Sequence, residues 1–493
     1  MTMNLDAAQV AVFLGITVLI AVLTVLGTRG HRTGAGGEQD YFLAGGSLKW
    51  YFVAGSITLT NLSTDQLIGM NGNQMALLAW WELAAVVGLL MLAFVFIPVY
   101  YKYNCTTTTE LLERRYGNPH IRALVSVLFL AGNVFIFLPA ILYGGSLFMQ
   151  QMFGLETVSI WWIAVGFAVV GSAYAIFGGL RAVAVSDTIS GFLILGLALY
   201  VVWLAMRAID GDFSGIPRER LSLIGGYDSP IPFATLFTGM IFIQMFYWST
   251  NQTITQRAMA SPSVREAQVG ILVAAAIRLL IVPVIVVVPG IVSFKLYGEL
   301  GNNLAYGTLV RDVLPPVLSG AFAAAIAAAV LTTFNSILNA SAALWVVDIH
   351  KTYVNDTPRV RALSFWVSLA MVALAFLMFP VFLGAQNLIN LVQQLYGYLS
   401  MPILSAFVVG LLFRGVNAYA VILSTVFGVA LYAVLTEVWP ALPGGNYIHM
   451  MAVTLLASVA MALLLNRVVF GGRAQWDAHT VFGRGPDPDL AAQ

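Results

Sequence analysis

Polar side chains interrupt an apolar segment between Ser56 and Gly72, where the sequence reads SITLTNLSTDQLIGMNG. Asn61, Asp65 and Gln66 would lie at bilayer depth, where a lipid-facing helix carries apolar residues. Polar or irregular backbone at that depth is tolerated where it is buried in protein or lines a cavity. We therefore predict a broken helix with a solute and a cation at the break, as is typical of transporters. The alternative is a polar contact between helices, because Ser, Thr and Asn are common there.

A second polar group follows a run of alanines in the segment Ala321–Leu344, AFAAAIAAAVLTTFNSILNASAAL. The small residues predict close approach to neighbouring helices. The polar residues that share one helix face are Thr332, Asn335, Ser336 and Asn339. Hydroxyl and amide oxygens, together with carbonyls freed by a broken helix, suit Na⁺. The alternative is that these side chains bond back to their own helix or to a neighbour.

Three ionisable residues also fall within apolar segments: Glu82, Asp187 and Arg278. Such residues are costly at membrane depth and indicate function by default. An internal ion pair would explain Arg278 without a functional role, and exposure at the interface would explain Glu82.

An aromatic–polar cluster is formed by Tyr247 and Trp248 beside Gln244 and Asn251. Aromatic rings of this kind stack on sugar rings or close a cavity, although membrane-interface belts also use Tyr and Trp. Gln393 adds an amide in a later apolar segment.

The composition defines the class of protein. The chain has 493 residues, of which 60% are hydrophobic and 9% are charged, so we expect a polytopic membrane protein. A net charge of +1 argues against nucleic acid as a partner. The single cysteine excludes a disulfide framework and a thiol metal cluster. The sequence has no phosphate-binding loop, nucleophile elbow or metal-hydrolase motif, which argues against an ATP-driven pump and an enzyme.

Thirteen apolar stretches are long enough to cross a bilayer as helices. They lie at 8–27, 48–72, 80–101, 121–149, 157–177, 182–207, 232–252, 266–296, 316–346, 361–380, 388–412, 416–437 and 446–468. With the N-terminus outside, 17 of the 23 Lys and Arg residues, Arg257 among them, fall in cytoplasmic loops. This bias predicts an extracellular or periplasmic N-terminus and a cytoplasmic C-terminus.

A short repeat links two of these stretches. Ser63-Thr64-Asp65-Gln66 is echoed by Ser249-Thr250-Asn251-Gln252, five helices later. This spacing is expected when a five-helix unit is repeated, since inverted repeats place paired interrupted helices at the binding site. We therefore expect a second broken helix at 249–252.

Four motifs together resemble the sodium:solute symporter family, and most closely its bacterial sodium–sugar branch of sodium–glucose and sodium/galactose cotransporters. They are YFLAGGSLKW, SITLTNLSTDQLIGMNG, FYWSTNQTITQRAMASPSVREAQVG and LTTFNSILNASAALWVVDIHK, and the resemblance runs from about Tyr41 to Arg414. It implies an all-α polytopic membrane protein with the leucine-transporter-type 5+5 inverted repeat and about 13 transmembrane helices. The implied organisation is an extra helix and loop (1–47), the first repeat (48–207), an extracellular loop (208–231), the second repeat (232–412), two accessory helices (413–468) and a cytoplasmic tail (469–493).

The resemblance also implies ligands for sodium. In the family the ion is held by backbone carbonyls and two hydroxyls, which correspond here to Leu59, Leu62, Ala329, Thr332 and Thr333. Some relatives carry a further sodium, which would correspond to Asp187, Asn335 and Ser336.

The positions that contact solute in the sugar branch are also implied by the resemblance. They correspond to Asn61, Gln66, Glu82, Tyr247, Trp248 and Gln393, with Tyr247 as an inner gate. Three positions depart from the galactose transporter pattern: Arg278 replaces a lysine, Gln244 an asparagine and Ala85 a serine. These departures leave a polyol site in place but do not specify the sugar.

The resulting expectation is a secondary transporter that couples Na⁺ to uptake of a sugar or polyol by alternating access, in the plasma or inner membrane. A symporter of an organic acid or amino acid (sialic acid, monocarboxylate or proline type) is the alternative, because Arg278 could pair with a carboxylate. A solute sensor is disfavoured by the short tail after Asn466. A cation channel is disfavoured by the paired broken helices, which favour occluded sites.

Overall fold

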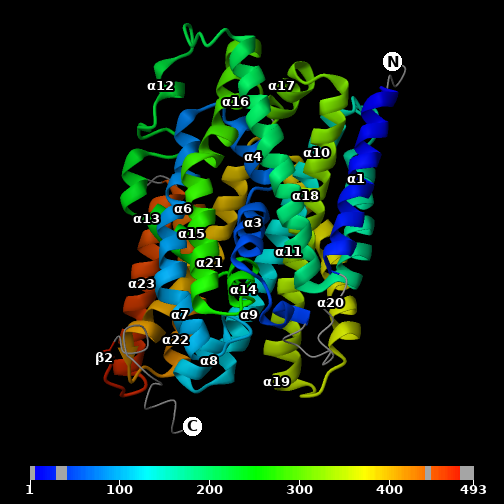
Figure 1. Ribbon diagram of the computed structural model, residues 1–493. Helices are drawn as coiled ribbons and strands as arrows, with labels where there is room; N and C mark the ends of the chain where they lie inside the picture. The colour runs from blue at the N-terminus through cyan, green and yellow to red at the C-terminus, as the bar shows by residue number, and fades with distance from the viewer. Residues whose placement is uncertain (1–5, 29–40, 302, 439–445, 478–493) are drawn as a thin grey trace.

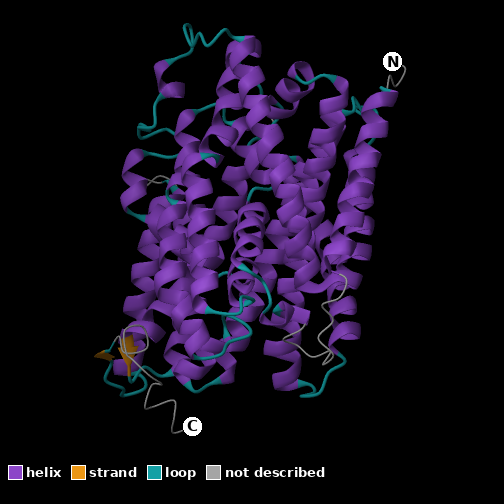
Figure 2. Cartoon of the chain, viewed as in Figure 1, coloured by secondary structure: helices purple, strands orange, loops and turns teal. Residues whose placement is uncertain are grey.

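The computed structural model describes residues 6–28, 41–301, 303–438 and 446–477, with backbone alone at 173–179. Nearly all of the described chain is helical, and most helices run along one common direction (Figures 1 and 2). α1 begins at the end of the bundle where α12 and α17 lie, whereas α8, α19 and β2 lie at the opposite end (Figure 1). Three cations used in the orientation prediction, Arg29, Arg32 and Arg484, lie outside the described residues.

The helices of the first half are Ala7–Thr28 (α1), Trp50–Asn61 (α3), Thr64–Gly72 (α4), Trp80–Leu83 (α5), Ala85–Met91 (α6), Ile97–Lys102 (α7), Glu110–Tyr116 (α8), Pro119–Gly132 (α9), Leu138–Met152 (α10), Ile160–Ala208 (α11) and Arg218–Leu221 (α12). Those of the second half are Gly239–Ser249 (α13), Gln252–Met259 (α14), Val264–Leu280 (α15), Val282–Tyr297 (α16), Ala305–Val313 (α17), Pro316–Ala343 (α18), Lys351–Tyr353 (α19), Val360–Leu383 (α20), Leu388–Leu412 (α21), Ala418–Ala433 (α22) and Tyr447–Val468 (α23). Short π-helical turns join several of these helices, for example η6 (Leu344–His350) after α18. Phe413–Arg414 (β1) pairs antiparallel with Gln475–Trp476 (β2).

Ten helical segments in the described part of the chain are long and apolar enough to span a bilayer. The remaining predicted spans differ for two physical reasons. The stretches 48–72 and 232–252 each contain a break, so the helices on either side of the break are too short to be counted as membrane spans. The stretch 182–207 corresponds to the counted span Leu180–Ala208, whereas 157–177 is matched only by the shorter apolar helix Ile160–Ser172. Both of these helices lie within the bounds of α11.

Both predicted helix breaks are present, and each coincides with one copy of the repeated quartet. α3 ends at Asn61 and α4 begins at Thr64, with Ser63 in extended backbone between them. α13 ends at Ser249 and α14 begins at Gln252. The side chain of Asn251 caps α14 by accepting a hydrogen bond from the backbone N–H of Thr253 at 2.9 Å.

Close packing of glycines holds the broken helices against their neighbours. A Cβ at Gly55 in α3 would collide with the side chain of Thr188, and one at Gly191 would collide with Leu59, so α3 and α11 pack closely. A Cβ at Gly145 in α10 would collide with the side chain of Val330 in α18, so these two helices also pack closely.

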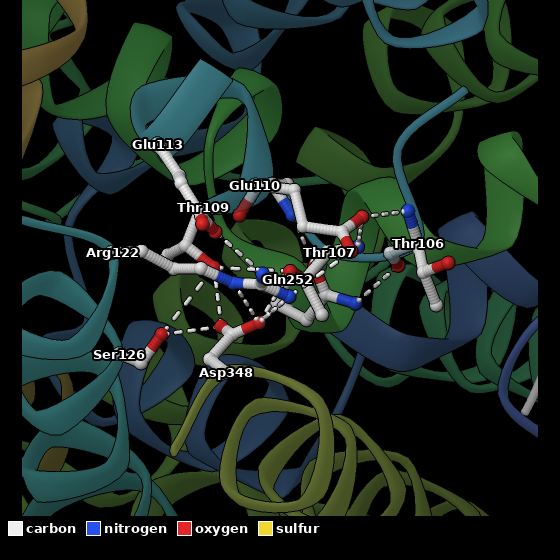
Figure 3. A network of polar contacts seen from close by, with 10 residues as sticks. Thr106, Thr107, Thr109, Glu110, Glu113, Arg122, Ser126, Gln252 and Asp348 are labelled. Carbon is white, nitrogen blue, oxygen red and sulfur yellow. Dashed lines mark hydrogen bonds and ion pairs between the residues drawn. The ribbon is translucent and has the colours of Figure 1, made fainter. Parts of the chain in front are cut away.

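A polar network ties the second break to one end of the bundle (Figure 3). Asp348 accepts hydrogen bonds from Arg122 Nε at 2.7 Å and from Thr107 Oγ1 at 2.7 Å. Gln252, the first residue of α14, accepts from the backbone N–H of Thr108 at 2.9 Å. The segment that leads into α8 therefore joins α9, the π-helical turn η6 and the start of α14 in one set of contacts.

Candidate functional site

The first group of predicted solute residues meets at the break between α3 and α4. Asn61, at the end of α3, donates from Nδ2 to the hydroxyl of Tyr247 at 3.0 Å. Its Oδ1 accepts from Nε2 of Gln66 at 2.7 Å. The unwound chain thus brings residues from α3, α4 and α13 into one chain of hydrogen bonds.

The second group surrounds a buried ion pair. Arg278 donates from Nη1 to Oε2 of Glu82 and from Nη2 to the carbonyl of Thr58 at 3.1 Å. Its guanidinium carbon lies 4.5 Å from the ring centroid of Trp248, in a cation–π contact. Both charged side chains are buried, so the internal ion pair is present and Glu82 does not face the interface.

Gln244 completes this second group. Its Oε1 accepts from Nε1 of Trp248 at 2.9 Å, and its Nε2 donates to the carbonyl of Trp81 at 2.9 Å. The two groups adjoin, because the rings of Tyr247 and Trp248 lie 5.2 Å apart at an interplanar angle of 81°. Gln393 is half-buried, and no hydrogen bond among the described residues joins its side chain to either group.

A small cavity opens beside the first group. It has room for roughly one water molecule. The residues that line it are Thr60, Asn61, Ser63, Asp65, Phe137, Ile141, Tyr247, Asn251, Thr253, Thr333 and Ile337. Solute positions on α3 and α13 therefore share one cavity with Thr333, a predicted sodium ligand on α18.

The break also frees the backbone carbonyls that the resemblance assigns to sodium. In a continuous helix the N–H of Ser63 would bond to the carbonyl of Leu59, but here it donates to Asn61 at 2.8 Å. The N–H of Gln66 would bond to Leu62, but it donates to Ser63 at 3.2 Å. Both predicted carbonyl ligands have thus lost their usual helical donors.

The facing helix supplies oxygens of the same kind. Thr332 Oγ1 donates to the carbonyl of Ala329 at 3.2 Å, so two predicted ligands are adjacent. Thr333 Oγ1 is buried and has no hydrogen-bond partner among the described residues. Uncharged hard oxygens with an unpartnered buried hydroxyl fit a sodium ion. The donor set on these residues is therefore compatible with the expected ion.

The predicted second sodium residues lie around a different cation. Asp187 Oδ2 accepts from Ser56 Oγ at 2.6 Å and lies 3.7 Å from Nη2 of Arg257. The guanidinium of Arg257 also donates to Ser56 Oγ at 2.7 Å and to the hydroxyl of Ser336. The amide of Asn335 is buried without a hydrogen-bond partner in the described part of the chain. A positive charge thus already sits against Asp187 and Ser336.

Sequence reasoning missed two residues of this region. It counted Arg257 as a loop cation, but this side chain is fully buried in α14 and pairs with Asp187. It noted Asp65 in the polar stretch without assigning a role, and Asp65 lines the cavity. The sequence signal that could have placed Arg257 near the site was its position, eight residues beyond Ser249 at the second break.

Comparisons with known proteins agree with this geometry. A model described as "Sodium:solute symporter family" matches residues 41–428. The chain is 33% identical to the uncharacterized symporter YidK of Escherichia coli (strain K12) over 489 residues, covering 94% of this chain and 84% of that protein. It is 30% identical to the sodium/glucose cotransporter of Vibrio parahaemolyticus over 426 residues, covering 79% of this chain and 77% of that protein.

Among solved structures, the fold is similar to that of a Na⁺-coupled sialic acid symporter in a substrate-bound outward-open state. The TM-score is 0.81, with coverage of 96% of this chain and 100% of the other. The sequence identity is 16%, so this likeness concerns the fold alone. The leucine-transporter-type fold expected from the sequence is confirmed.

Proposed function

The chain belongs to the sodium:solute symporter family, and we propose that the solute it carries with Na⁺ is a sugar or another polyol. Sodium-coupled symport by alternating access, in a multi-pass membrane protein, is the activity of this family. The protein is accordingly a secondary transporter and not an enzyme.

The observation that carries the polyol assignment is the pairing of Arg278. A carboxylate solute needs a cation that can pair with it, but Arg278 is already bound to Glu82 and Thr58 and stacked on Trp248. The amides of Asn61 and Gln66 and the phenol of Tyr247 offer donors and acceptors suited to hydroxyl groups. A relative described as a sodium/glucose cotransporter supports the same substrate class.

We assign the coupling ion to the oxygens of Leu59, Leu62, Ala329, Thr332 and Thr333. Two belong to freed carbonyls at the break in the first repeat, and the others to the facing helix α18. Because Arg257 stands beside Asp187 and Ser336, we propose that a single sodium is coupled in each cycle.

One ion supplies enough free energy for useful uptake. Moving one charge through 100 mV gives about 2.3 kcal/mol. A tenfold sodium gradient adds about 1.4 kcal/mol. Together these correspond to an accumulation of roughly a few hundredfold. The ion can drive solute because it binds one conformation better than the other.

We further propose that the N-terminus faces the outside of the inner or plasma membrane. The positive-inside rule supports this orientation, with α12 and α17 outside and α8 and α19 inside. The two inverted repeats are assigned to 48–207 and 232–412, because each begins with a span that holds one of the broken helices.

Ligand binding to the purified protein tests the substrate assignment. A panel of sugars, polyols and organic acids is added in Na⁺ or in K⁺ at equal ionic strength, and the thermal unfolding temperature is measured. We expect stabilisation by one or more sugars or polyols that depends on Na⁺. Sodium-dependent stabilisation by an organic acid alone would keep the symport and overturn the polyol assignment.

A further inference from the structure

The buried charges of the described chain do not balance. Seven charged side chains are buried there: Asp65, Glu82, Arg122, Asp187, Arg257, Arg278 and Asp348. Four are acidic and three are basic. Each arginine lies against one of the other buried carboxylates, in the pairs Glu82–Arg278, Asp187–Arg257 and Asp348–Arg122. Arg122 also contacts Glu110 and Glu113, which are only partly buried, as Figure 3 shows. Asp65 is the carboxylate left without a basic partner.

The surroundings of Asp65 provide polar contacts but no whole positive charge. Its Oδ1 accepts a hydrogen bond from Ser63 Oγ at 2.6 Å, and the backbone amides of Asp65 and Gln66 also approach the carboxylate. These amides begin α4, and a helix N-terminus carries roughly half a positive charge. Asp65 is only 9% exposed, so bulk water does not compensate the rest of its negative charge.

Asp65 shares a cavity with Thr333, one of the five residues to which we assign the coupling ion. Asp65 and Thr333 line the same cavity, together with Ser63, which follows the carbonyl ligand Leu62. Among the described residues that line this cavity there is no lysine, arginine or histidine. A buried carboxylate beside uncharged oxygen ligands, with no cation of its own, is suited to hold a cation.

We propose that Asp65 is the counter-charge of the transported sodium ion. This inference rests on the proposed sodium site but not on the identity of the solute. With Na⁺ bound, the core formed by Asp65, Glu82, Asp187, Arg257 and Arg278 has no net charge. Without Na⁺ it carries one negative charge. The empty protein, rather than the loaded one, is therefore the form whose reorientation responds to membrane voltage.

Sodium binding in the absence of solute tests this proposal. Thermal unfolding of purified protein is followed while NaCl replaces choline chloride at constant ionic strength. We expect Asp65→Asn to raise the half-saturating sodium concentration tenfold or more, and Asp65→Glu to stay within about threefold of the unsubstituted protein. Asp356→Asn, in an exposed loop, is the matched control and should leave sodium binding unchanged. An unchanged sodium response in Asp65→Asn overturns the proposal.

Two further readouts separate a counter-charge from a structural or solute-binding role. At saturating Na⁺, Asp65→Asn should bind the solute identified in the panel within a few-fold of normal. A lost solute affinity with normal sodium affinity would make Asp65 a solute ligand and overturn the proposal. In the unsubstituted protein in planar membranes, voltage should move charge in the absence of both Na⁺ and solute. Charge movement seen only with Na⁺ would contradict the proposal. This readout uses the unsubstituted protein, so it does not depend on the folding of Asp65→Asn.

Discussion

The hydroxyl of Thr333 illustrates how single side chains define this site. It is buried on α18, it has no hydrogen-bond partner among the described residues, and it faces the break between α3 and α4. A buried hydroxyl without a partner is costly, so an ion that accepts its oxygen as a ligand resolves an otherwise unfavourable arrangement.

Thr333→Ala should therefore raise the sodium concentration needed for half-maximal binding by about tenfold, or about 1.4 kcal/mol. Thr333→Ser keeps the hydroxyl oxygen, so its half-maximal sodium concentration should remain close to that of the unsubstituted protein. The measurement is thermal stabilisation by NaCl without solute. Thr425→Ala is the matched control, because that buried hydroxyl donates back to the carbonyl of Val421 at 2.9 Å within α22. A sodium requirement that does not change in Thr333→Ala would rule out this ligand assignment.

At the residue scale the sequence predicted which residue types belong to the site but not how they pair. Asn61, Gln66 and Tyr247 could be predicted as site residues, because amides and a phenol stand out in apolar helices. The partners of Arg278 and Arg257 could not be named, since each pair joins helices far apart in the chain. Nor could the sequence show which side chains Gln393 contacts, so its role as a solute residue stays a prediction.

Broken helices are the elements that position the site, and close packing holds them. Asn71 of α4 donates from Nδ2 to the carbonyl of Ile285 at 3.2 Å and accepts from the N–H of Gly290 at 2.8 Å. A Cβ at Gly290 would lie against the backbone of Asn71, closer than real Cβ atoms come. The second half of the broken helix is thus fixed against α16.

Gly290→Ala should lower the free energy of unfolding by about 1–3 kcal/mol, because the added methyl group forces α4 and α16 apart. The same change should weaken solute binding, since α4 carries Gln66. Thermal unfolding and solute titration measure the two effects. Gly166→Ala is the control, because that helical glycine has no atom near its would-be Cβ. Equal stability of the two variants would show that the α4–α16 contact is not tight.

Element boundaries were predictable where apolar runs were long and uninterrupted. The predicted span 361–380 corresponds to α20 (Val360–Leu383), and 446–468 to α23 (Tyr447–Val468). The two breaks were predictable because polar quartets repeat there. The joining of 157–177 and 182–207 within α11 was not, since a short connection with Gly178 and Gly179 reads as a loop.

At the scale of the whole molecule, orientation in the membrane decides the direction of transport. The sequence has one cysteine, Cys105, which is buried, and burial raises the pKa of its thiol well above the usual range. It should therefore be nearly inert to thiol reagents, because the thiolate is the reactive form. The natural protein is a suitable background for introduced cysteines.

Asp228→Cys and Asp356→Cys place matched reporters in the exposed segments that follow α12 and α19, respectively. These two helices lie at opposite ends of the bundle (Figure 1). In intact cells, a membrane-impermeant maleimide should label Asp228→Cys. Asp356→Cys should be labelled only after permeabilisation. The reverse pattern would place the N-terminus in the cytoplasm and contradict the proposed orientation.

The central claim is that this protein couples sodium to movement of a polyol. The most direct measurement is uptake of the radiolabelled sugar or polyol identified by thermal shift into proteoliposomes that contain the purified protein. With an inward Na⁺ gradient and an inside-negative potential, we expect transient accumulation well above equilibrium, lost when K⁺ replaces Na⁺. Uptake that only equilibrates, or that proceeds equally in K⁺, would contradict coupled symport. Sodium-driven accumulation of an organic acid instead would contradict the polyol assignment.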